Sequence, residues 1–169
     1  KRGKKQLIML GFSDSTKDGG YLMANWSIYK AKVELTAIAR KYEIDLAFFD
    51  GRGGPPARGG GKTHRFYATM GEEIENNHIQ LTIQGQTISS QYGSFDTAHY
   101  NIEQLINAGI VSAITPQERN TFTAAQKDLI DRMAQVSHKA YVTLREDPLL
   151  LKYLEQYSPL KFLSQINIS

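Results

Sequence analysis

Two segments of this sequence have residue types and spacing that suit anion binding. In the first, Asp50–Gly61, Arg52 and Arg58 stand six residues apart and most other positions are glycine. Glycine lets the backbone approach a ligand closely, so N–H groups such as those of Gly53 and Gly59 can converge on one anion. The planar guanidinium group adds paired donors that match phosphate or carboxylate. The alternative is a flexible glycine loop with two solvated arginines.

The second segment, Ser13–Gly20, is polar, and we expect it to be a loop. Asp14 offers a hard oxygen ligand that can bind a metal ion, and Lys17 offers an ammonium group. Solvated loop aspartates are common, but this one follows an apolar run and closely precedes a lysine. Together the two segments predict a site for a metal-bound small molecule that carries phosphate or carboxylate.

Apolar runs precede both segments and predict the strands that position them. Gln6–Phe12 and Leu46–Phe49 read as buried strands, and between them Tyr21–Tyr42 has apolar residues at helical spacings of three and four. A strand, a helix and a strand in this order form a βαβ unit with parallel strands. Because ligand sites collect at the carboxyl ends of parallel strands, we expect both segments at one edge of the sheet.

The middle of the chain predicts one further strand and more helix. We expect a loop with a short helix over Lys62–Asn77, a third strand over His78–Gln84, and a helix over Thr97–Ala108 that Gly109 ends. The fold class that follows is α/β and helix-rich, with parallel strands and long helices.

A long helix is predicted near the end of the chain. The segment Thr115–Glu118 matches a capping box, after which a helix should run to about Arg145. Six residues should mark its buried face, which are Phe122, Leu129, Met133, Val136, Ala140 and Leu144. Two further short helical pieces are expected after Pro148 and Pro159.

Composition narrows the class of protein. The 169 residues are 41% hydrophobic and 22% charged, which is typical of a soluble domain with a core. Without cysteine the chain has no disulfide or thiolate–metal site, and a cytoplasmic location is favoured. No apolar run approaches the ~20 residues that span a membrane, and a net charge of +3 is too small to indicate nucleic acid. The absence of an initial methionine suggests a fragment of a longer chain.

Three tempting motifs have weaker support. Gly61-Lys62-Thr63 matches the end of a P-loop, but Pro56 stands where that motif needs its first glycine and cannot donate an N–H group. The two Arg-Gly-Gly triplets resemble RNA-binding tails, which are longer, repeated and disordered. The four histidines lack metal-ligand spacing on any one element, although His64 closely follows the glycine segment.

Taken together, these residues resemble phosphoenolpyruvate carboxylase. Leu10–Gly20 is similar to the family pattern G-[FY]-S-D-S-x-K-D-x-G, and Phe49–Gly61 is similar to F-H-G-R-G-G-x-x-x-R-G-G-G. Ile83–Gln86 is similar to the region around the family's Q-G-E segment. The resemblance covers essentially the whole sequence and implies an internal piece of the C-terminal half, with residues 1–169 forming one fragment of a catalytic (β/α)8 TIM-type barrel. Full-length members are usually homotetramers.

The resemblance also implies a reaction and residue roles. The family converts phosphoenolpyruvate and bicarbonate to oxaloacetate and phosphate with Mg²⁺ or Mn²⁺. Asp14 would bind the metal, Lys17 would lie near the substrate, and Arg52 and Arg58 would hold phosphate or carboxyphosphate. The Arg58 position also contributes to an allosteric dicarboxylate site. Further ligands and an essential histidine lie upstream in the family, so we expect the isolated fragment to be inactive.

Two departures from the family pattern concern charge. Asp50 replaces a histidine at a position expected to be catalytic, and an ionised aspartate cannot donate a proton. Facing a phosphate at ~4 Å, it would cost about 4 kcal/mol per charge pair at an effective dielectric of ~20. It could instead pair with Arg52 or Arg58, turn away, or bind metal. Gln86 replaces the glutamate of Q-G-E. A degenerate or regulatory paralogue, or an unrelated phosphate-binding (β/α) module, are the alternatives.

Overall fold

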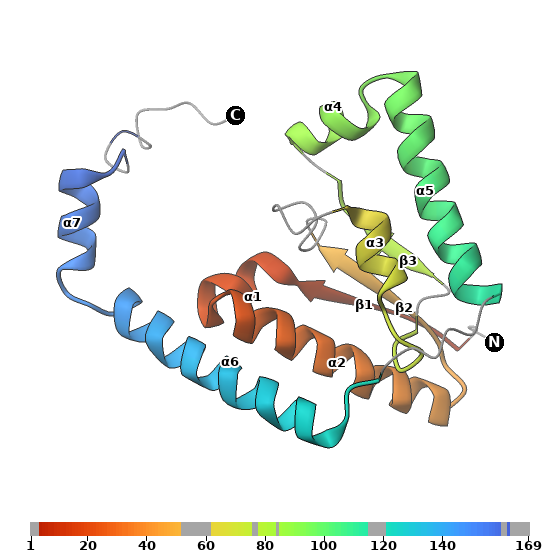
Figure 1. Ribbon diagram of the computed structural model, residues 1–169, viewed down its shortest axis with the longest axis horizontal. Helices are drawn as coiled ribbons and strands as arrows, with labels where there is room; N and C mark the ends of the chain where they lie inside the picture. Colours follow the sequence, from red (N-terminus) through yellow and green to blue (C-terminus); the bar gives the residue numbers. More distant parts are fainter. Residues whose placement is uncertain are drawn as a thin grey trace.

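The computed structural model describes residues 4–51, 62–75, 78–83, 85–114, 121–159 and 162. Its centre is a parallel sheet of three strands, β1 (Lys5–Gly11), β2 (Asp45–Gly51) and β3 (Ile79–Leu81), in the spatial order β1-β2-β3 (Figure 1). Strands that are consecutive in the sequence are therefore neighbours in the sheet. The predicted helix-rich α/β class with parallel strands is confirmed.

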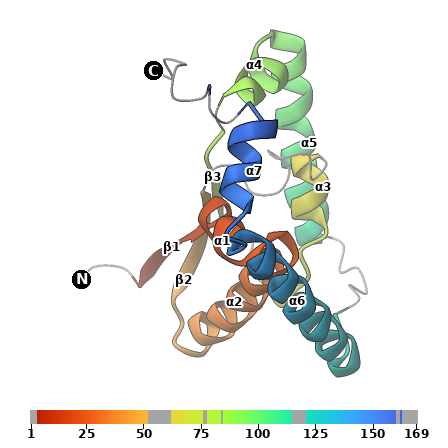
Figure 2. The same ribbon diagram turned by 90° about the vertical axis from the view of Figure 1, so that its left-hand side faces the viewer.

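Helices account for most of the described residues. They are α1 (Phe12–Gly19), α2 (Tyr21–Lys41), α3 (Thr63–Ala68), α4 (Gln86–Tyr92), α5 (Phe95–Ile114), α6 (Ala124–Arg145) and α7 (Leu150–Tyr157). The helix α2 connects β1 to β2, and α6 lies alongside α2, while α3 and α4 contact α5 (Figures 1 and 2). Among the residues that the structure describes, no helix is both long and apolar enough to cross a membrane.

The core lies between α2 and the sheet. Leu46 and Phe48 alternate along β2 and are buried against Ala39 of α2 and Ile74 of the segment after α3. Alternate residues of a strand point to the same face, so this pattern places Asp50 on the buried face as well. Removing these apolar side chains from water is the main force that holds the sheet and α2 together.

The polar segment Ser13–Gly20 is mostly helix and not the expected loop. Its helix α1 buries Phe12 and Ser13, and the Thr16 hydroxyl donates a hydrogen bond to the Phe12 carbonyl at 2.7 Å. Gly20 ends the helix with a φ of 77°, a conformation that favours glycine. Serine, aspartate and glycine are weak helix formers, so packing on α2 decides the structure here.

Two other predicted boundaries are wrong. The helix α5 continues through Gly109 to Ile114, since one glycine within a helix costs only about 1 kcal/mol relative to alanine. The helix α6 begins at Ala124 and not near Thr115, because Thr123 and Gln126 form the capping box. The residues 115–120, which include the expected capping box, lie outside the described ranges.

The predicted third strand is shorter than expected, and the expected helices are partly confirmed. Among the described residues of the predicted span His78–Gln84, which leave out Gln84, only Ile79–Leu81 pairs with β2. The short helix predicted within Lys62–Asn77 is α3. Beyond Pro148, α7 forms one of the two predicted short pieces, and α6 ends at Arg145 as expected.

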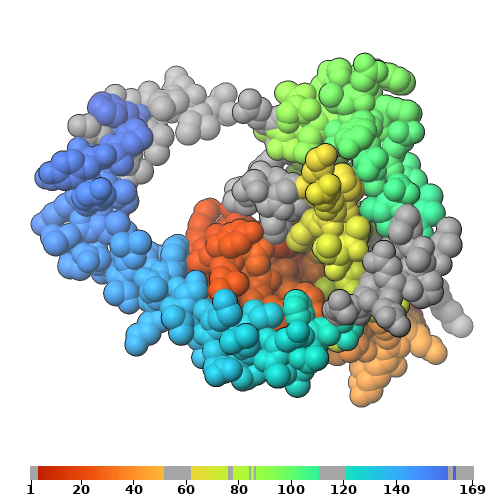
Figure 3. Space-filling view, viewed as in Figure 1, coloured from red at the N-terminus to blue at the C-terminus, as the bar shows by residue number. Residues whose placement is uncertain are grey.

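The helix α6 packs through the opposite face to the predicted one. Its predicted core residues are exposed, including Leu129, Met133, Val136 and Leu144. Ala134 is buried instead, and polar neighbours of that face bond to α1 and α2. Figure 3 shows α6 lying against α1 and α2. Its exposed apolar residues therefore form part of the outer surface of the described residues.

Candidate functional site

The strand ends confirm that the two predicted segments begin at one edge of the sheet. Gly11 at the end of β1 is the register partner of Gly51 at the end of β2, and Leu10 is the partner of Asp50. The third strand ends at the same level, because Leu81 is also paired with Asp50. Gly85 then begins the connection to α4 with a φ of 61°. This carboxyl edge is the candidate site.

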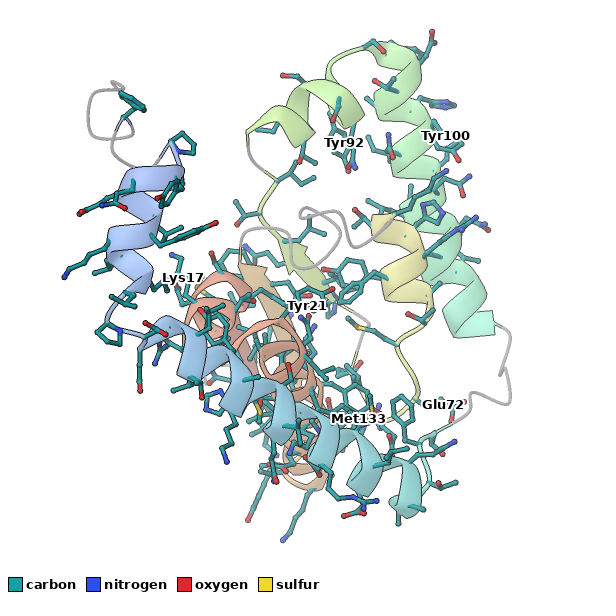
Figure 4. The ribbon with its side chains drawn as sticks, turned by 60° about the vertical axis from the view of Figure 1, so that its left-hand side comes forward. Lys17, Tyr21, Glu72, Tyr92, Tyr100 and Met133 are labelled. Atoms are coloured by element: carbon teal, nitrogen blue, oxygen red, sulfur yellow. The ribbon has the colours of Figure 1, made fainter. Side chains whose placement is uncertain are left out.

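Asp14 and Lys17 lie together on the surface of α1. Asp14 is in the first turn of this helix, and its Oδ1 lies 3.7 Å from the Lys17 Nζ. Their side chains are 82% and 70% exposed, so both remain accessible to a ligand. Helical geometry brings these residues together because positions three apart share one face. Figure 4 shows Lys17 on the side of α1 that faces the junction of α6 and α7.

Side chains of α6 hold the carboxyl end of α1. The Tyr141 hydroxyl donates a 2.6 Å hydrogen bond to the Lys17 carbonyl, and Arg145 donates a 3.0 Å bond to the Asp18 carbonyl. The His138 Nδ1 lies 3.2 Å from the Gly19 carbonyl oxygen. The last carbonyls of a helix lack partners within it and carry partial negative charge. These contacts therefore fix the helix that carries Asp14 and Lys17.

The other end of α6 is held by two carboxylates. Asp131 accepts hydrogen bonds from the Trp26 indole at 2.8 Å and from Lys30, and these bonds lower the pKa of its carboxyl. Glu73 accepts a 3.2 Å bond from Lys127 of α6 and a 3.0 Å bond from the Tyr29 hydroxyl of α2. Burial and this carboxylate raise the pKa of Tyr29 to about 12, so the phenol stays a donor at neutral pH. Each contact joins α6 or the segment after α3 to α2.

Asp50 is buried and paired with a lysine. The side chains of Asp50 and Lys32 are 1% and 3% exposed. The Lys32 Nζ lies 2.8 Å from Oδ1 and donates a 2.9 Å hydrogen bond to Oδ2. Burial lowers the pKa of Lys32, and the neighbouring carboxylate opposes this effect. Of the roles considered for Asp50, the described contacts support turning inward, away from the surface.

A tyrosine completes the environment of this carboxylate. The Tyr67 hydroxyl of α3 donates a 2.9 Å hydrogen bond to the Asp50 Oδ2. Burial, followed by the carboxylate charge, raises the pKa of Tyr67 and keeps the phenol protonated. The Lys32 Nζ also lies 5.9 Å and 5.3 Å from the ring centres of Phe12 and Phe48. Two aromatic rings thus lie close to the lysine of the buried pair.

Sequence reasoning missed Lys32 and Tyr67 as partners of Asp50. A signal existed for the first, because Lys32 lies four residues from Ile28 and from Thr36 on the buried face of α2. Asp50 likewise continues the alternation of buried residues along β2. Opposite charges at buried positions of a helix and its neighbouring strand point to an ion pair. No comparable pattern marks Tyr67, which depends on the tertiary path of α3.

Several predicted site residues lie outside the described residues. These are Arg52, Gly53, Arg58 and Gly59 of the glycine segment. Their roles stay predictions, as does any contact between them and Asp50. The same is true of Gln84, whereas the backbone of Gln86 begins α4.

The described residues fit a divalent cation only in part. Asp14 provides one accessible carboxylate, and Mg²⁺ is often bound by one or two carboxylates together with water and substrate phosphate. Within the described ranges, no group of three or more histidine or acidic side chains is placed to form a complete metal site. Asp14 alone could supply only one of the ligands that such a cation needs.

Comparison with known families assigns the whole sequence. The sequence model of the phosphoenolpyruvate carboxylase family matches residues 1–169. This match includes β1, the carboxyl edge of the sheet and both segments that begin there. We conclude that this chain belongs to the phosphoenolpyruvate carboxylase family.

Proposed function

We propose that this chain forms part of the active site of a carboxylase that converts phosphoenolpyruvate and bicarbonate to oxaloacetate and phosphate. The observation that carries the proposal is the register of β1 and β2, which aligns Gly11 with Gly51. Asp14 and Lys17 follow the first position closely, and the arginine segment follows the second. A substrate at this edge would meet both segments.

The proposed roles follow from the chemistry of the side chains. Arg52 and Arg58 would bind phosphate or carboxyphosphate and neutralise the charge that develops on the transferring group, assisted by backbone N–H groups of Gly53 and Gly59. Lys17 would contact the substrate through its exposed ammonium group. Asp14 would be one ligand of Mg²⁺ or Mn²⁺. The metal, when bound, supplies positive charge that stabilises substrate and enolate oxygens.

The three strands are further proposed to be part of a (β/α)8 barrel within a longer homotetrameric chain. Consecutive parallel strands that are also neighbours in the sheet support this architecture, because a barrel repeats that arrangement. A cytoplasmic location and an allosteric dicarboxylate that uses Arg58 belong to the same proposal. The isolated 169 residues are expected to have no carboxylase activity.

Oxaloacetate formation by the full-length protein tests the arginine roles. Replacing Arg52 or Arg58 with lysine removes the planar pair of donors but keeps the charge, and we expect kcat/KM to fall by about 10²-fold or more. Arg65→Lys is the matched control, because Arg65 lies on the exposed surface of α3. An active Arg52→Lys, Arg58→Lys double variant would contradict the assignment. Phosphate binding without any oxaloacetate formation by the wild type would instead favour a phosphate-binding module or a degenerate paralogue.

Metal dependence tests the role of Asp14. Asp14→Asn should raise the Mg²⁺ or Mn²⁺ concentration needed for half-maximal activity by about tenfold or more, because a neutral amide is a weaker ligand than a carboxylate. Asp18→Asn removes an exposed carboxylate from the same helix and should leave that concentration unchanged. Equal effects of the two changes would point to general electrostatics and not to coordination.

A further inference from the structure

The carboxylate of Asp50 joins elements on both sides of the glycine segment. Asp50 is near the end of β2, before residues 52–61, and Tyr67 lies on α3, after them. The 2.9 Å hydrogen bond between these side chains therefore connects positions 17 residues apart. Lys32 brings in α2 as a third element through the same carboxylate. One buried group thus fixes β2, α2 and α3 relative to one another.

Stability alone is a poor explanation for this arrangement. Burying an aspartate and a lysine removes both from water, and apolar side chains of similar volume often give equal or greater stability. An ion pair with a hydrogen-bonded phenol is directional, because its distances and angles are satisfied in only one arrangement of the elements that carry it. The aromatic rings of Phe12 and Phe48 strengthen that preference by excluding water from Lys32.

We propose that Lys32, Asp50 and Tyr67 act as one positioning unit that sets where β2 ends relative to α3, and that this is the contribution of Asp50 to the reaction in place of proton transfer or metal binding. The inference rests on the proposed function, because it concerns the residues that flank the proposed phosphate-binding segment. It makes Lys32 and Tyr67 positioning residues, which act through the Asp50 carboxylate.

The proposal explains how the chain accommodates an aspartate where the family pattern has histidine. The negative charge does not stand alone, because Lys32 neutralises it inside the protein. A substitution of Asp50 should therefore be tolerated only when Lys32 is substituted as well. Asp50→His alone would leave the buried Lys32 ammonium opposite an imidazole. Adding Lys32→Met removes that charge and keeps an unbranched side chain of similar length.

Rescue in the full-length protein is the first test. We expect Asp50→His to lower kcat/KM for phosphoenolpyruvate by about 10²-fold, the order of loss seen when reacting groups are misplaced by ~1 Å. The Lys32→Met, Asp50→His double variant should recover most of that loss, because without the buried ammonium a neutral imidazole nitrogen can accept the Tyr67 hydrogen bond in place of the Asp50 carboxylate. Lys41→Met, which changes an exposed lysine of the same helix, should have no effect alone and should not rescue. Full activity of Asp50→His alone, or failure of the double variant to recover, would overturn the inference.

Two further variants separate positioning from folding and from proton transfer. Tyr67→Phe keeps the ring in the core and removes only its hydrogen bond, so kcat/KM should fall by about tenfold while the folded fraction at the assay temperature stays unchanged. Asp50→Asn combined with Lys32→Met should keep the shape of the pH–rate profile. Loss of one limb of that profile would show that Asp50 transfers a proton, and unchanged activity of Tyr67→Phe would show that the positioning unit is not needed.

The failure of this inference is distinguishable from failure of the proposed function. A wild-type protein that forms no oxaloacetate would overturn the function, and with it any part of Asp50 in the reaction. An active wild type whose Asp50→His and Tyr67→Phe variants are equally active would overturn the positioning unit alone.

Discussion

The interior beneath the carboxyl edge and the outward face of α6 distribute polarity in opposite ways. Lys32, Thr36 and Asp50 are buried among α2, β2 and the segments near α3, whereas Met133 and Val136 are exposed on α6. The three buried polar side chains each have a hydrogen-bond partner, whereas the Met133 and Val136 side chains are 53% and 72% exposed. The contrast teaches that hydrogen bonds and ion pairs between polar side chains can decide which face of a helix packs, even when most of its apolar residues lie on the other face.

Removal of the lysine from the buried pair should have the largest effect on stability. Lys32→Met leaves the Asp50 carboxylate buried without its counter-ion, and we expect the free energy of unfolding to fall by about 3–5 kcal/mol. Urea unfolding measures this change. Lys41→Met should shift the same quantity by less than about 0.5 kcal/mol, since Lys41 is exposed. Equal losses would show that the buried pair has no special importance.

Loss of a buried hydroxyl acceptor should come next. The Thr36 side chain is 0% exposed and accepts a 2.9 Å hydrogen bond from the Glu75 backbone N–H group. Thr36→Val keeps the shape and removes the acceptor, and should cost about 1–3 kcal/mol. Thr143→Val makes the same change on the exposed surface of α6, where the hydroxyl bonds only within its own helix. A Thr36→Val protein that is more stable than the wild type would contradict the view that this buried hydroxyl stabilises the fold through its partner.

The contact between α6 and α1 should contribute less. Tyr141→Phe removes the hydrogen bond to the Lys17 carbonyl and should lower the free energy of unfolding by about 0.5–1.5 kcal/mol. Because the contact fixes α1, hydrogen exchange of the amides of Thr16–Gly19 should also accelerate. Tyr153→Phe changes an exposed tyrosine of α7 and serves as the control. Unchanged exchange in α1 would show that α6 does not restrain it.

The smallest effect is expected on the outward face of α6. Val136 is 72% exposed, so Val136→Ser should change the free energy of unfolding by no more than about 0.5 kcal/mol. Ala134→Ser, on the opposite and fully buried side of this helix, should cost more. A large loss in the free energy of unfolding from Val136→Ser in the full-length protein would show that this face of α6 is buried there by another part of the protein.

The sequence was sufficient for the features that depend on local pattern and chain order. The βαβ unit, the parallel strands and the shared edge of Gly11 and Gly51 all follow from alternating elements and the rules for connecting them. Helix α1 was missed because its residues have low helix propensity, and contacts with α2 override that preference. Gly109 was misjudged because glycine favours helix ends without requiring them.

The candidate site could be predicted only in its exposed half. Asp14 and Lys17 are three residues apart, so sequence spacing alone places them together once the helix is known. The partners of Asp50 are 18 and 17 residues away, on different elements. Such a contact depends on how α2 and α3 cross the sheet, which no local pattern specifies. The face of α6 was predicted wrongly for the same reason.

The contacts between α6 and α1 restrict amino-acid substitutions in α6 more than in α1. Tyr141, Arg145 and His138 all meet backbone carbonyls, which every amino acid possesses. The side chains at positions 17 and 18 can therefore change during evolution without losing these contacts, and only their chemistry toward a ligand constrains them. Substitutions at the three α6 positions carry the structural cost, so a ligand-binding helix and its support can evolve at different rates.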